Sequence, residues 1–351
     1  MANQGNGVGM AGPRNSITDI DGLRVGHSHD PDARTGVTVI LPDRMVTASV
    51  DVRGGGPGTR ETDALQPERL VGGLNALVLS GGSVYGLGAA DAVAGMLGAE
   101  GRGYALIPSP GVPVSPIVPS AILYDLANGG NKGWGDTPPY ARLGREALAH
   151  AKGEGGTDVG LGRTGAGYGA QAGAWPGGLG TASFVTPEGI TVGAIVAVNA
   201  FGSPYIPGTK CFWAWPFEMD GEFGGVRPDG GETAHGFPDD TKLGPVRAAG
   251  GAQNSAGVAK PGANTTICAV ATDAALSTAD CKRLAIMAQD GLSRAIRPAH
   301  APVDGDTVFA LSTGARDLPE PRALSLSVLG NHAADCLARA IARGVHAANG
   351  A

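Results

Sequence analysis

Short apolar runs rich in β-branched residues occur through residues 1–200 and predict buried strands. They lie at residues 36–41 (GVTVIL), 47–52 (TASVDV), 76–80 (ALVLS), 180–184 and 190–198 (ITVGAIVAV). Helical spacing of apolar positions predicts helices at residues 83–97, 118–128 and 138–151, the first with small residues that permit close packing. Strands and helices therefore both contribute to this part of the chain.

The pattern changes at residues 200–263, where turn signals such as SPYIPG, RPDGGE and KPGA replace regular periodicity. A structureless segment of this length is uncommon inside a compact domain and is usually functional. We therefore expect a Gly/Pro-rich loop that borders a site.

Regular patterns return after this loop. They predict a strand at 266–272, a helix at 277–296 that begins with a Ser277–Asp280 capping box, a strand at 306–312 and a helix at 324–346. The order strand, helix, strand, helix favours a layered α/β fold.

Composition supports a globular protein. The 351 residues include 60 Gly and 25 Pro, but 42% are hydrophobic, which is enough for one large domain with a substantial core. The net charge is −6 and the basic residues are scattered singly, which argues against a nucleic-acid partner. We find no apolar stretch of membrane-spanning length and no secretion signal. The four cysteines (Cys211, Cys268, Cys281 and Cys336) are widely spaced, so we expect a cytoplasmic protein with reduced, mostly buried thiols.

Two ligand motifs have simpler explanations. The pattern G-x-G-x-x-G occurs at residues 7–12 and 160–165, but neither copy follows a convincing strand, so we expect no dinucleotide site. His27 and His29 would share one face only in a strand, and no second cluster accompanies them and Asp30. Zinc needs three or four ligands, so we interpret these residues as surface or loop positions and expect no metal.

Gly81, Gly82 and Ser83 follow a predicted strand and begin a predicted helix. Free N–H groups at such a junction can bind an anion or an oxyanion. The alternative is a tight turn with Ser83 as a helix cap. The sequence leaves both interpretations open.

Thr265 stands where the long loop ends and an apolar strand begins. If the peptide bond after Asn264 were cut, Thr265 would carry a free α-amine with a pKa of about 7.7–8.0, able to act as base toward its own hydroxyl. The alternative is an ordinary polar residue at a strand start.

Asp304 and Asp306 precede another predicted strand. They either cap a turn or hold the α-ammonium of Thr265 or of a substrate.

Ordered motifs extend over most of the chain. They include residues 17–27 (ITDIDGLRVGH), 54–63 (GGGPGTRETD), 79–87 (LSGGSVYGL), 177–184 (GGLGTASF), 194–202 (AIVAVNAFG), 263–273 (ANTTICAVATD) and 304–311 (DGDTVFAL). They resemble the family of L-aminopeptidase/D-esterases, β-peptidyl aminopeptidases and 6-aminohexanoate-oligomer hydrolases. The resemblance implies an αββα four-layer sandwich of the N-terminal-nucleophile type. It also implies a precursor that cleaves itself into an α chain (1–264) and a β chain (265–351), and a tetramer of such αβ units.

The same resemblance assigns roles to individual residues. Thr265 would be the nucleophile, Asn199 the oxyanion-stabilising amide, Tyr124 a residue of the substrate pocket, and Asp304 and Asp306 the acidic pair beside the nucleophile. Gly81, Gly82 and Ser83 stay in the candidate substrate-binding or oxyanion-binding set.

The chain departs from the family at Pro176, where many members carry a Lys directly before the Gly pair of GG-x-GTAS. A cation expected beside the site is therefore missing from this position. We expect an autoprocessing amide hydrolase that needs no metal or organic cofactor and acts on short peptides, amino-acid amides or ω-amino-acid oligomers. Two alternatives stay open: a self-cleaving acyltransferase of the ornithine-acetyltransferase type, and an uncleaved binding protein of the same fold, for which Pro176 is the only support.

Overall fold

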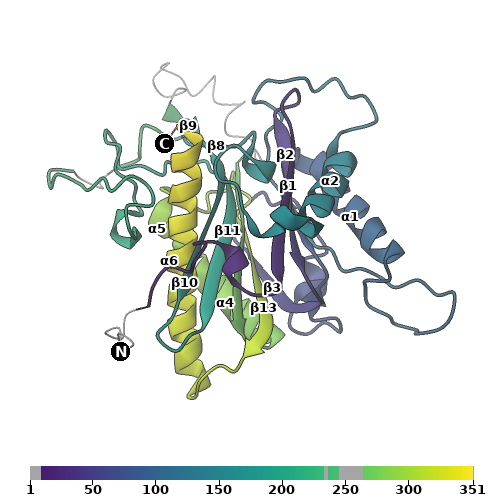
Figure 1. Cartoon of the computed structure of the whole chain (residues 1–351). Coiled ribbons are helices and arrows are strands. Elements are labelled where there is room, and N and C mark those ends of the chain that lie inside the picture. The colour runs from purple at the N-terminus through teal and green to yellow at the C-terminus, as the bar shows by residue number, and fades with distance from the viewer. Residues whose placement is uncertain (1–8, 233–235, 245–263, 351) are drawn as a thin grey trace.

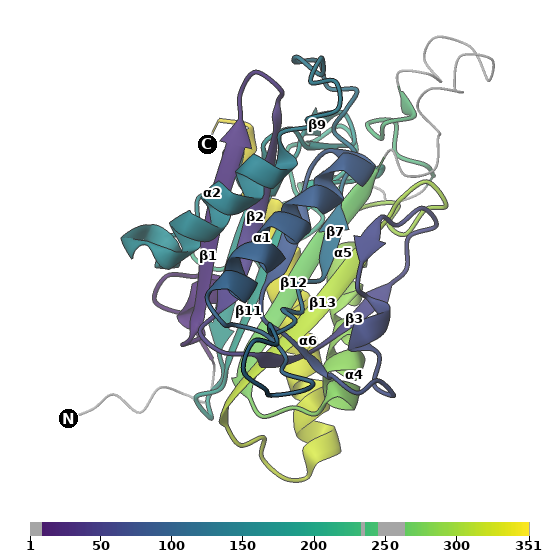
Figure 2. The same ribbon diagram turned by 90° about the vertical axis from the view of Figure 1, so that its right-hand side faces the viewer.

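Two β-sheets lie face to face, with helices covering both outer faces (Figures 1 and 2). The structure is a computed structural model and describes residues 9–232, 236–244 and 264–350. In Figure 1 the layers run from the long C-terminal helix on the left to a pair of helices on the right.

The first sheet contains five strands, in the order β1 (Leu23–Asp30), β2 (Thr35–Pro42), β6 (Leu77–Ser80), β7 (Ser120–Ile122) and β4 (Thr59–Arg60). The second contains six, in the order β10 (Gly178–Val185), β11 (Thr191–Asn199), β12 (Thr265–Ala274), β13 (Thr307–Arg316), β3 (Val46–Val52) and β5 (Gly73–Leu74). A separate hairpin consists of β8 (Gln171–Ala172) and β9 (Trp175–Pro176). The α-helices within the described residues are α1 (Gly88–Ala99), α2 (Tyr140–Lys152), α4 (Thr278–Ala288), α5 (Asp290–Ala295) and α6 (Arg322–Ala348).

Alternation of side chains along the strands builds three separate layers of apolar core. On β2, Val37 and Val39 pack under α1 and α2, while Ile40 points between the sheets. On β12, Val270 packs under α6, while Ala269 points between the sheets. Because successive residues of a strand face opposite sides, each sheet is buried on both faces. This arrangement confirms the expected αββα sandwich.

Most predicted elements are present. All seven predicted strands occur, each with small shifts at its ends, and the predicted helices at 138–151 and 324–346 correspond to α2 and α6. The predicted helix 277–296 is divided at Gln289 into α4 and α5. Its capping box is present, because Asp280 N–H donates to Ser277 Oγ (3.1 Å) and Ser277 N–H donates to Asp280 Oδ2 (3.0 Å).

The predicted helix at 118–128 is wrong. Residues Ser120–Ile122 form β7, parallel to β6, and the backbone on both sides of β7 is bonded to that strand. Val78 N–H donates to the Pro119 carbonyl (3.1 Å), and Leu123 N–H donates to the Ser80 carbonyl (2.9 Å). Pro119 also biases the residue before it toward extended backbone. Together, this bias and the pairing with β6 override the helical spacing of apolar residues.

Two other details differ from expectation. The helix predicted from residue 83 starts with a 3-10 turn, Ser83–Leu87, and α1 begins only at Gly88. Strand β1 was not expected, and it contains His27 and His29, which are therefore not loop residues. His27 contacts Thr38 on β2, and His29 stacks on Tyr168.

Residues 200–232 and 236–244 have little regular structure apart from one 3-10 turn, Trp215–Phe217. Buried aromatic side chains, including Tyr205, Phe212 and Phe223, pack in the same apolar core layer as helix α6 and hold this segment in place. Residues 233–235 and 245–263 of the expected loop lie outside the described residues.

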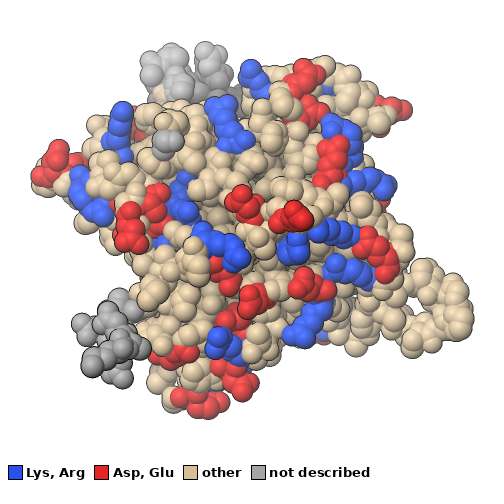
Figure 3. Space-filling model, viewed as in Figure 1, with Lys and Arg blue, Asp and Glu red and all other residues tan. Residues whose placement is uncertain are grey.

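The thiols are buried, as the sequence predicts, and charges of both signs lie on the surface (Figure 3). On the face in Figure 3, basic and acidic side chains are interspersed, without a continuous basic patch. The four cysteines are free and buried. Within the described ranges, none of the helices combines the length and apolar character needed to cross a membrane.

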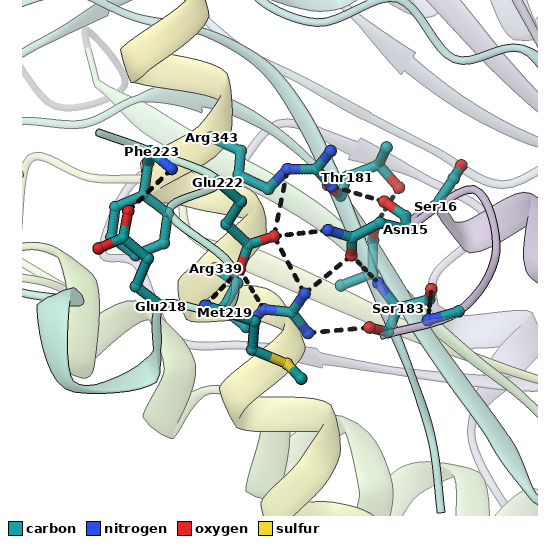
Figure 4. A network of polar contacts seen from close by, with 12 residues as sticks. Asn15, Ser16, Thr181, Ser183, Glu218, Met219, Glu222, Phe223, Arg339 and Arg343 are labelled. Carbon is teal, nitrogen blue, oxygen red and sulfur yellow. Dashed lines mark hydrogen bonds and ion pairs between the residues drawn. The ribbon is translucent and has the colours of Figure 1, made fainter. Parts of the chain in front are cut away.

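A buried polar network joins α6 to the loop and to the N-terminal segment (Figure 4). Arg339, whose side chain is 2% exposed, contacts Glu222 at 2.5 Å and donates to Asn15 Oδ1 (2.8 Å) and the Ser183 carbonyl (2.8 Å). Arg343 Nε lies 3.4 Å from the same Glu222 carboxylate. Segments far apart in the sequence thus meet around one buried carboxylate.

Candidate active site

Thr265 is the first residue of β12, in the middle of the second sheet. It lies opposite Asn199, the last residue of β11, and is 1% exposed. Its hydroxyl donates a hydrogen bond to the carbonyl oxygen of Asn264. A hydroxyl is therefore in contact with the peptide group that joins residues 264 and 265.

Three hydrogen bonds fix the Asn199 side chain. Its Oδ1 accepts from Gln171 N–H (3.0 Å) and from Lys242 Nζ (3.2 Å), and its Nδ2 donates to the Tyr124 carbonyl (3.0 Å). Donors on one side and an acceptor on the other determine which atom of the amide is nitrogen. Because a primary amide has two N–H groups, Nδ2 keeps one for a further acceptor.

Asp304 and Asp306 lie in the turn before β13. Asp306 Oδ1 accepts from Thr266 N–H (2.9 Å), and its Oδ2 accepts from His300 N–H and contacts His300 Nδ1, both at 2.9 Å. Asp304 accepts from the backbone N–H groups of Phe201 (3.1 Å) and Ala301 (3.0 Å). A Cβ placed on Gly305 would lie 2.7 Å from Thr265 Oγ1, so this turn packs directly against the Thr265 hydroxyl.

Burial shifts two ionisable groups beside Asn199. Burial and the negative charge of Asp306 raise the pKa of Asp304 to about 7. Burial lowers the pKa of Lys242 to about 7, against the opposing effect of Asp304. A carboxyl and an amine that both titrate near neutral pH can exchange protons with a reacting group.

Residues 54–56, the three glycines of GGGPGT, hold the Asp304–Asp306 turn. Gly56 N–H donates to the Asp304 carbonyl (2.7 Å), and Gly54 N–H donates to the Asp306 carbonyl (3.2 Å). A Cβ on Gly54 would lie 2.3 Å from Asp306 N. The close approach of the two backbones explains why glycine is needed at this position.

The Gly81–Gly82–Ser83 segment forms a tight turn whose N–H groups all have acceptors. Gly81 N–H donates to the Gly36 carbonyl (2.9 Å), Gly82 N–H to Asp125 Oδ1 (2.8 Å) and Ser83 N–H to the Leu123 carbonyl (2.9 Å). Gly82 and Ser83 have φ angles of 86° and 53°. In this conformation none of the three N–H groups is free to bind an oxyanion, which favours a tight turn. The expected role of Ser83 as helix cap is wrong, because the N-cap of the 3-10 turn is Gly82 and no side chain caps it. Tyr124 is half-buried, and its carbonyl reaches the site through Asn199.

Lys242, His300 and Gln171 are residues that the sequence analysis missed. Lys242 lies in the aperiodic segment after residue 200, and no motif marks it. Pro176 pairs with Gln171 across the β8–β9 hairpin, and Gln171 N–H donates to the same Asn199 oxygen that Lys242 contacts. Lys242 therefore brings a cation to the neighbourhood where the family resemblance expects one.

Asn264 is buried, and within the described part of the chain its two side-chain polar atoms have no hydrogen-bond partner. Among the described residues, no group of three or more His, Cys, Asp or Glu side chains is placed to hold a metal ion. The site thus combines a hydroxyl, an amide donor, two carboxyls and an amine. Such a set can support nucleophilic attack on a carbonyl.

Comparison with known proteins gives a consistent result. The family model described as peptidase family S58 matches residues 15–351. An uncharacterised aminopeptidase of Mycobacterium bovis is 46% identical over 348 residues, covering 94% of this chain and 93% of that protein. A 6-aminohexanoate-oligomer endohydrolase of Kocuria sp. is 30% identical over 311 residues, covering 86% of this chain and 76% of that protein.

The solved structures agree on the fold. The L-aminopeptidase D-Ala-esterase/amidase of Ochrobactrum anthropi, described as a variant of the N-terminal-nucleophile hydrolase fold, matches with a TM-score of 0.64 at 23% identity over 96% of this chain and 88% of that chain. The β-aminopeptidase of Burkholderia sp. matches with a TM-score of 0.64 at 24% identity over the same shares of the two chains. These matches confirm the family resemblance and the fold expected from it.

Proposed function

Because this chain belongs to peptidase family S58, an amide-hydrolysing family, we propose that it cleaves itself once, between Asn264 and Thr265, and then uses Thr265 as its nucleophile. The observation that carries this proposal is the contact of the Thr265 hydroxyl with the Asn264 carbonyl at the buried start of β12. The Asn199 amide lies opposite Thr265 in the strand register, with a spare N–H.

In maturation, Thr265 Oγ1 attacks the carbonyl carbon of Asn264. The C–N bond breaks, the acyl group passes from nitrogen to oxygen, and the hydroxyl proton ends on the Thr265 nitrogen. Water then hydrolyses the ester, which leaves a carboxylate on Asn264 and a free amine on Thr265. Release of Asn264 also frees a side chain that lacks a hydrogen-bond partner among the described residues.

In turnover, the new α-amine takes the proton from the Thr265 hydroxyl, because its pKa of about 7.7–8.0 suits a base at neutral pH. The hydroxyl attacks the substrate amide, and the spare N–H of Asn199 stabilises the oxyanion. One such donor contributes roughly 3–4 kcal/mol to the transition state. The amine product leaves, and water releases the acyl group from Thr265. None of these steps needs a metal or an organic cofactor.

The acidic pair points to substrates with a free amino end. Asp304 and Asp306 place two buried carboxyls beside Thr265, where they can pair with an ammonium group. The matched relatives are named as an aminopeptidase and as a 6-aminohexanoate-oligomer endohydrolase. We therefore propose short peptides, amino-acid amides and ω-amino-acid oligomers as the substrate class.

Denaturing electrophoresis tests self-cleavage directly. The 34.9 kDa chain should separate into a larger and a smaller fragment, and N-terminal sequencing of the smaller one should begin at Thr265. The Thr265→Val substitution keeps the side-chain shape but removes the hydroxyl, and it should abolish cleavage and amidase activity. Thr266→Val is the matched control, because Thr266 is equally buried and should tolerate the same change.

Three outcomes would contradict the proposal. A wild-type chain that stays intact on prolonged incubation would favour the uncleaved binding protein. Amidase activity in the Thr265→Val variant would exclude Thr265 as nucleophile. Transfer of the acyl group to added amino acids in excess of hydrolysis would favour the acyltransferase.

A further inference from the structure

Lys242 is held in a defined position against Asn199. Its Nζ lies 3.2 Å from Asn199 Oδ1 and 3.3 Å from the Asn199 carbonyl oxygen. Its backbone N–H donates to the Phe201 carbonyl (3.1 Å), which ties the residue to the chain just after β11. The Lys242 side chain therefore starts from a fixed backbone and does not reach the site from a distant surface position.

Asp240, two residues before Lys242, secures the same segment. Its carboxylate accepts hydrogen bonds from Ser203 Oγ (2.5 Å) and Trp175 Nε1 (3.4 Å), and its carbonyl accepts from Ala174 N–H (2.8 Å). Ser203 follows β11, while Ala174 and Trp175 belong to the β8–β9 hairpin. The chain after β11 and the β8–β9 hairpin, which both lie beside Asn199, therefore hold the segment that carries Lys242.

An ammonium group on Asn199 Oδ1 has two chemical effects. It fixes the amide with its nitrogen turned away from the cation, and it withdraws electron density from the amide, which makes the N–H groups stronger donors. Burial increases both effects, because charge interactions are stronger away from water. A stronger donor is most useful when the acceptor is an oxyanion.

We propose that Lys242 is a positioning residue for the oxyanion site, where its ammonium orients and polarises the Asn199 amide during self-cleavage and turnover. This inference rests on the proposed function. It adds a residue that neither the motifs nor the comparisons assign.

The charge state of Lys242 makes the proposal testable by pH. The ionisable group that faces Lys242 is Asp304, and Asp306 with His300 lies beyond Asp304. Asp240, on the same segment as Lys242, accepts hydrogen bonds from Ser203 and Trp175. Burial lowers the pKa of Lys242 to about 7, so the ammonium is lost as the pH rises through neutrality. The uncut precursor has no free amine on Thr265, so its cleavage rate reports these groups without interference from the α-amine.

The experiment follows cleavage of freshly synthesised, labelled precursor across a range of pH on denaturing gels. The wild-type rate should fall as the pH rises above about 7, where Lys242 loses its proton. Lys242→Met should slow cleavage by about tenfold to hundredfold at neutral pH, the range of one charge-assisted hydrogen bond. Lys242→Arg keeps the charge at every pH, so its rate should fall less than the wild-type rate on the alkaline side, where only Asp304 of the two groups still titrates.

Two further measurements distinguish this role from a structural one. In the mature enzyme, Lys242→Met should lower kcat and leave KM nearly unchanged, because the oxyanion exists only in the transition state. Lys210→Met is the matched control, since Lys210 lies in the same loop but is exposed, and it should behave as wild type. Thermal unfolding of each variant checks that the fold is kept.

Cleavage of Lys242→Met at the wild-type rate would overturn the inference, and so would an unchanged alkaline fall in Lys242→Arg. These results differ from failure of the proposed function, in which the wild-type chain itself stays uncut and inactive. If Lys242→Met does not fold, the pH profile of Lys242→Arg still decides.

Discussion

The Asp304 carboxyl is buried beside a second carboxyl, and this position determines its ionisation. Burial and the charge of Asp306 raise its pKa from the ordinary 3.8 to about 7. Between about pH 4 and pH 7, the folded chain therefore still holds a proton that the unfolded chain has already released. Because the native state binds more protons in this window, the free energy of unfolding should decrease as the pH rises through it.

We expect Asp304→Asn to remove the contribution of Asp304 to this pH dependence, since an amide cannot ionise. Urea unfolding measured from pH 4 to pH 7 tests it, in a Thr265→Val background that keeps the chain in one piece. The lowered pKa of Lys242 affects stability only above about pH 7, so the two groups act in different windows. Asp21→Asn, an exposed position, serves as control. A slope that is the same with and without Asp304 would show that another group causes it.

At the scale of elements, the turn before β13 depends on a glycine from another segment. In Gly54→Ala the new Cβ would lie 2.3 Å from Asp306 N and 2.6 Å from the Asp304 carbonyl oxygen, both backbone atoms that cannot move aside cheaply. We expect a loss of about 1–3 kcal/mol in the free energy of unfolding, the usual cost of overpacking. Self-cleavage should slow as well, because the turn packs on the Thr265 hydroxyl.

Gly95→Ala provides the contrast. Gly95 lies inside α1 with no atom within 4 Å of an added Cβ, so alanine should raise the free energy of unfolding by about 0.5–1 kcal/mol. Urea denaturation of the two variants measures both effects, and denaturing gels measure cleavage. Equal stability of Gly54→Ala and wild type would mean that the two backbones can separate without cost.

The elements that the sequence predicts correctly are those whose apolar spacing agrees with their tertiary environment. Strand β12 and helix α6 are examples, because one face or both faces of each are buried along their length. Residues 118–128 have helical spacing, yet pairing with β6 places Ser120–Ile122 of this range in a sheet, and this pairing involves residues distant in sequence. Local patterns cannot contain that information.

The candidate site divides in the same way. Thr265 and the two aspartates stand at strand starts and belong to recognisable motifs, so sequence alone singles them out. Lys242 belongs to an aperiodic segment, and only the fold brings it to Asn199. Likewise, the glycines at 81 and 82 are visible as a motif, but only the backbone geometry shows that their N–H groups already have acceptors.

At the scale of the whole molecule, the proposed cut divides the chain without dividing the fold. Strands β12 and β13 lie together inside the second sheet, and both come from residues 265–351. On one side β12 pairs with β11, and on the other side β13 pairs with β3, both from before the cut. Neither part can leave without exposing strand edges and two layers of apolar core.

The buried network around Glu222 adds a polar link across the same division. Arg339 and Arg343 belong to the part after the cut, while Glu222 and Asn15 belong to the part before it (Figure 4). The Glu222 side chain is 7% exposed, so removal of its charge takes away the carboxylate that both guanidinium groups contact. Breaking one partner of a buried ion pair costs about 3–5 kcal/mol.

We therefore expect the two fragments to co-elute in native size-exclusion chromatography and to separate only on denaturing gels. Glu222→Gln should lower the thermal unfolding temperature of the cleaved protein and release fragments at a lower urea concentration than wild type. Glu146→Gln is the control, because Glu146 forms an exposed ion pair with Arg142 and such pairs contribute at most about 1 kcal/mol. Fragments that elute separately without denaturant would show that the interleaved strands do not hold the two parts together. A Glu222→Gln protein as stable as the control would show that the buried network does not contribute to their association.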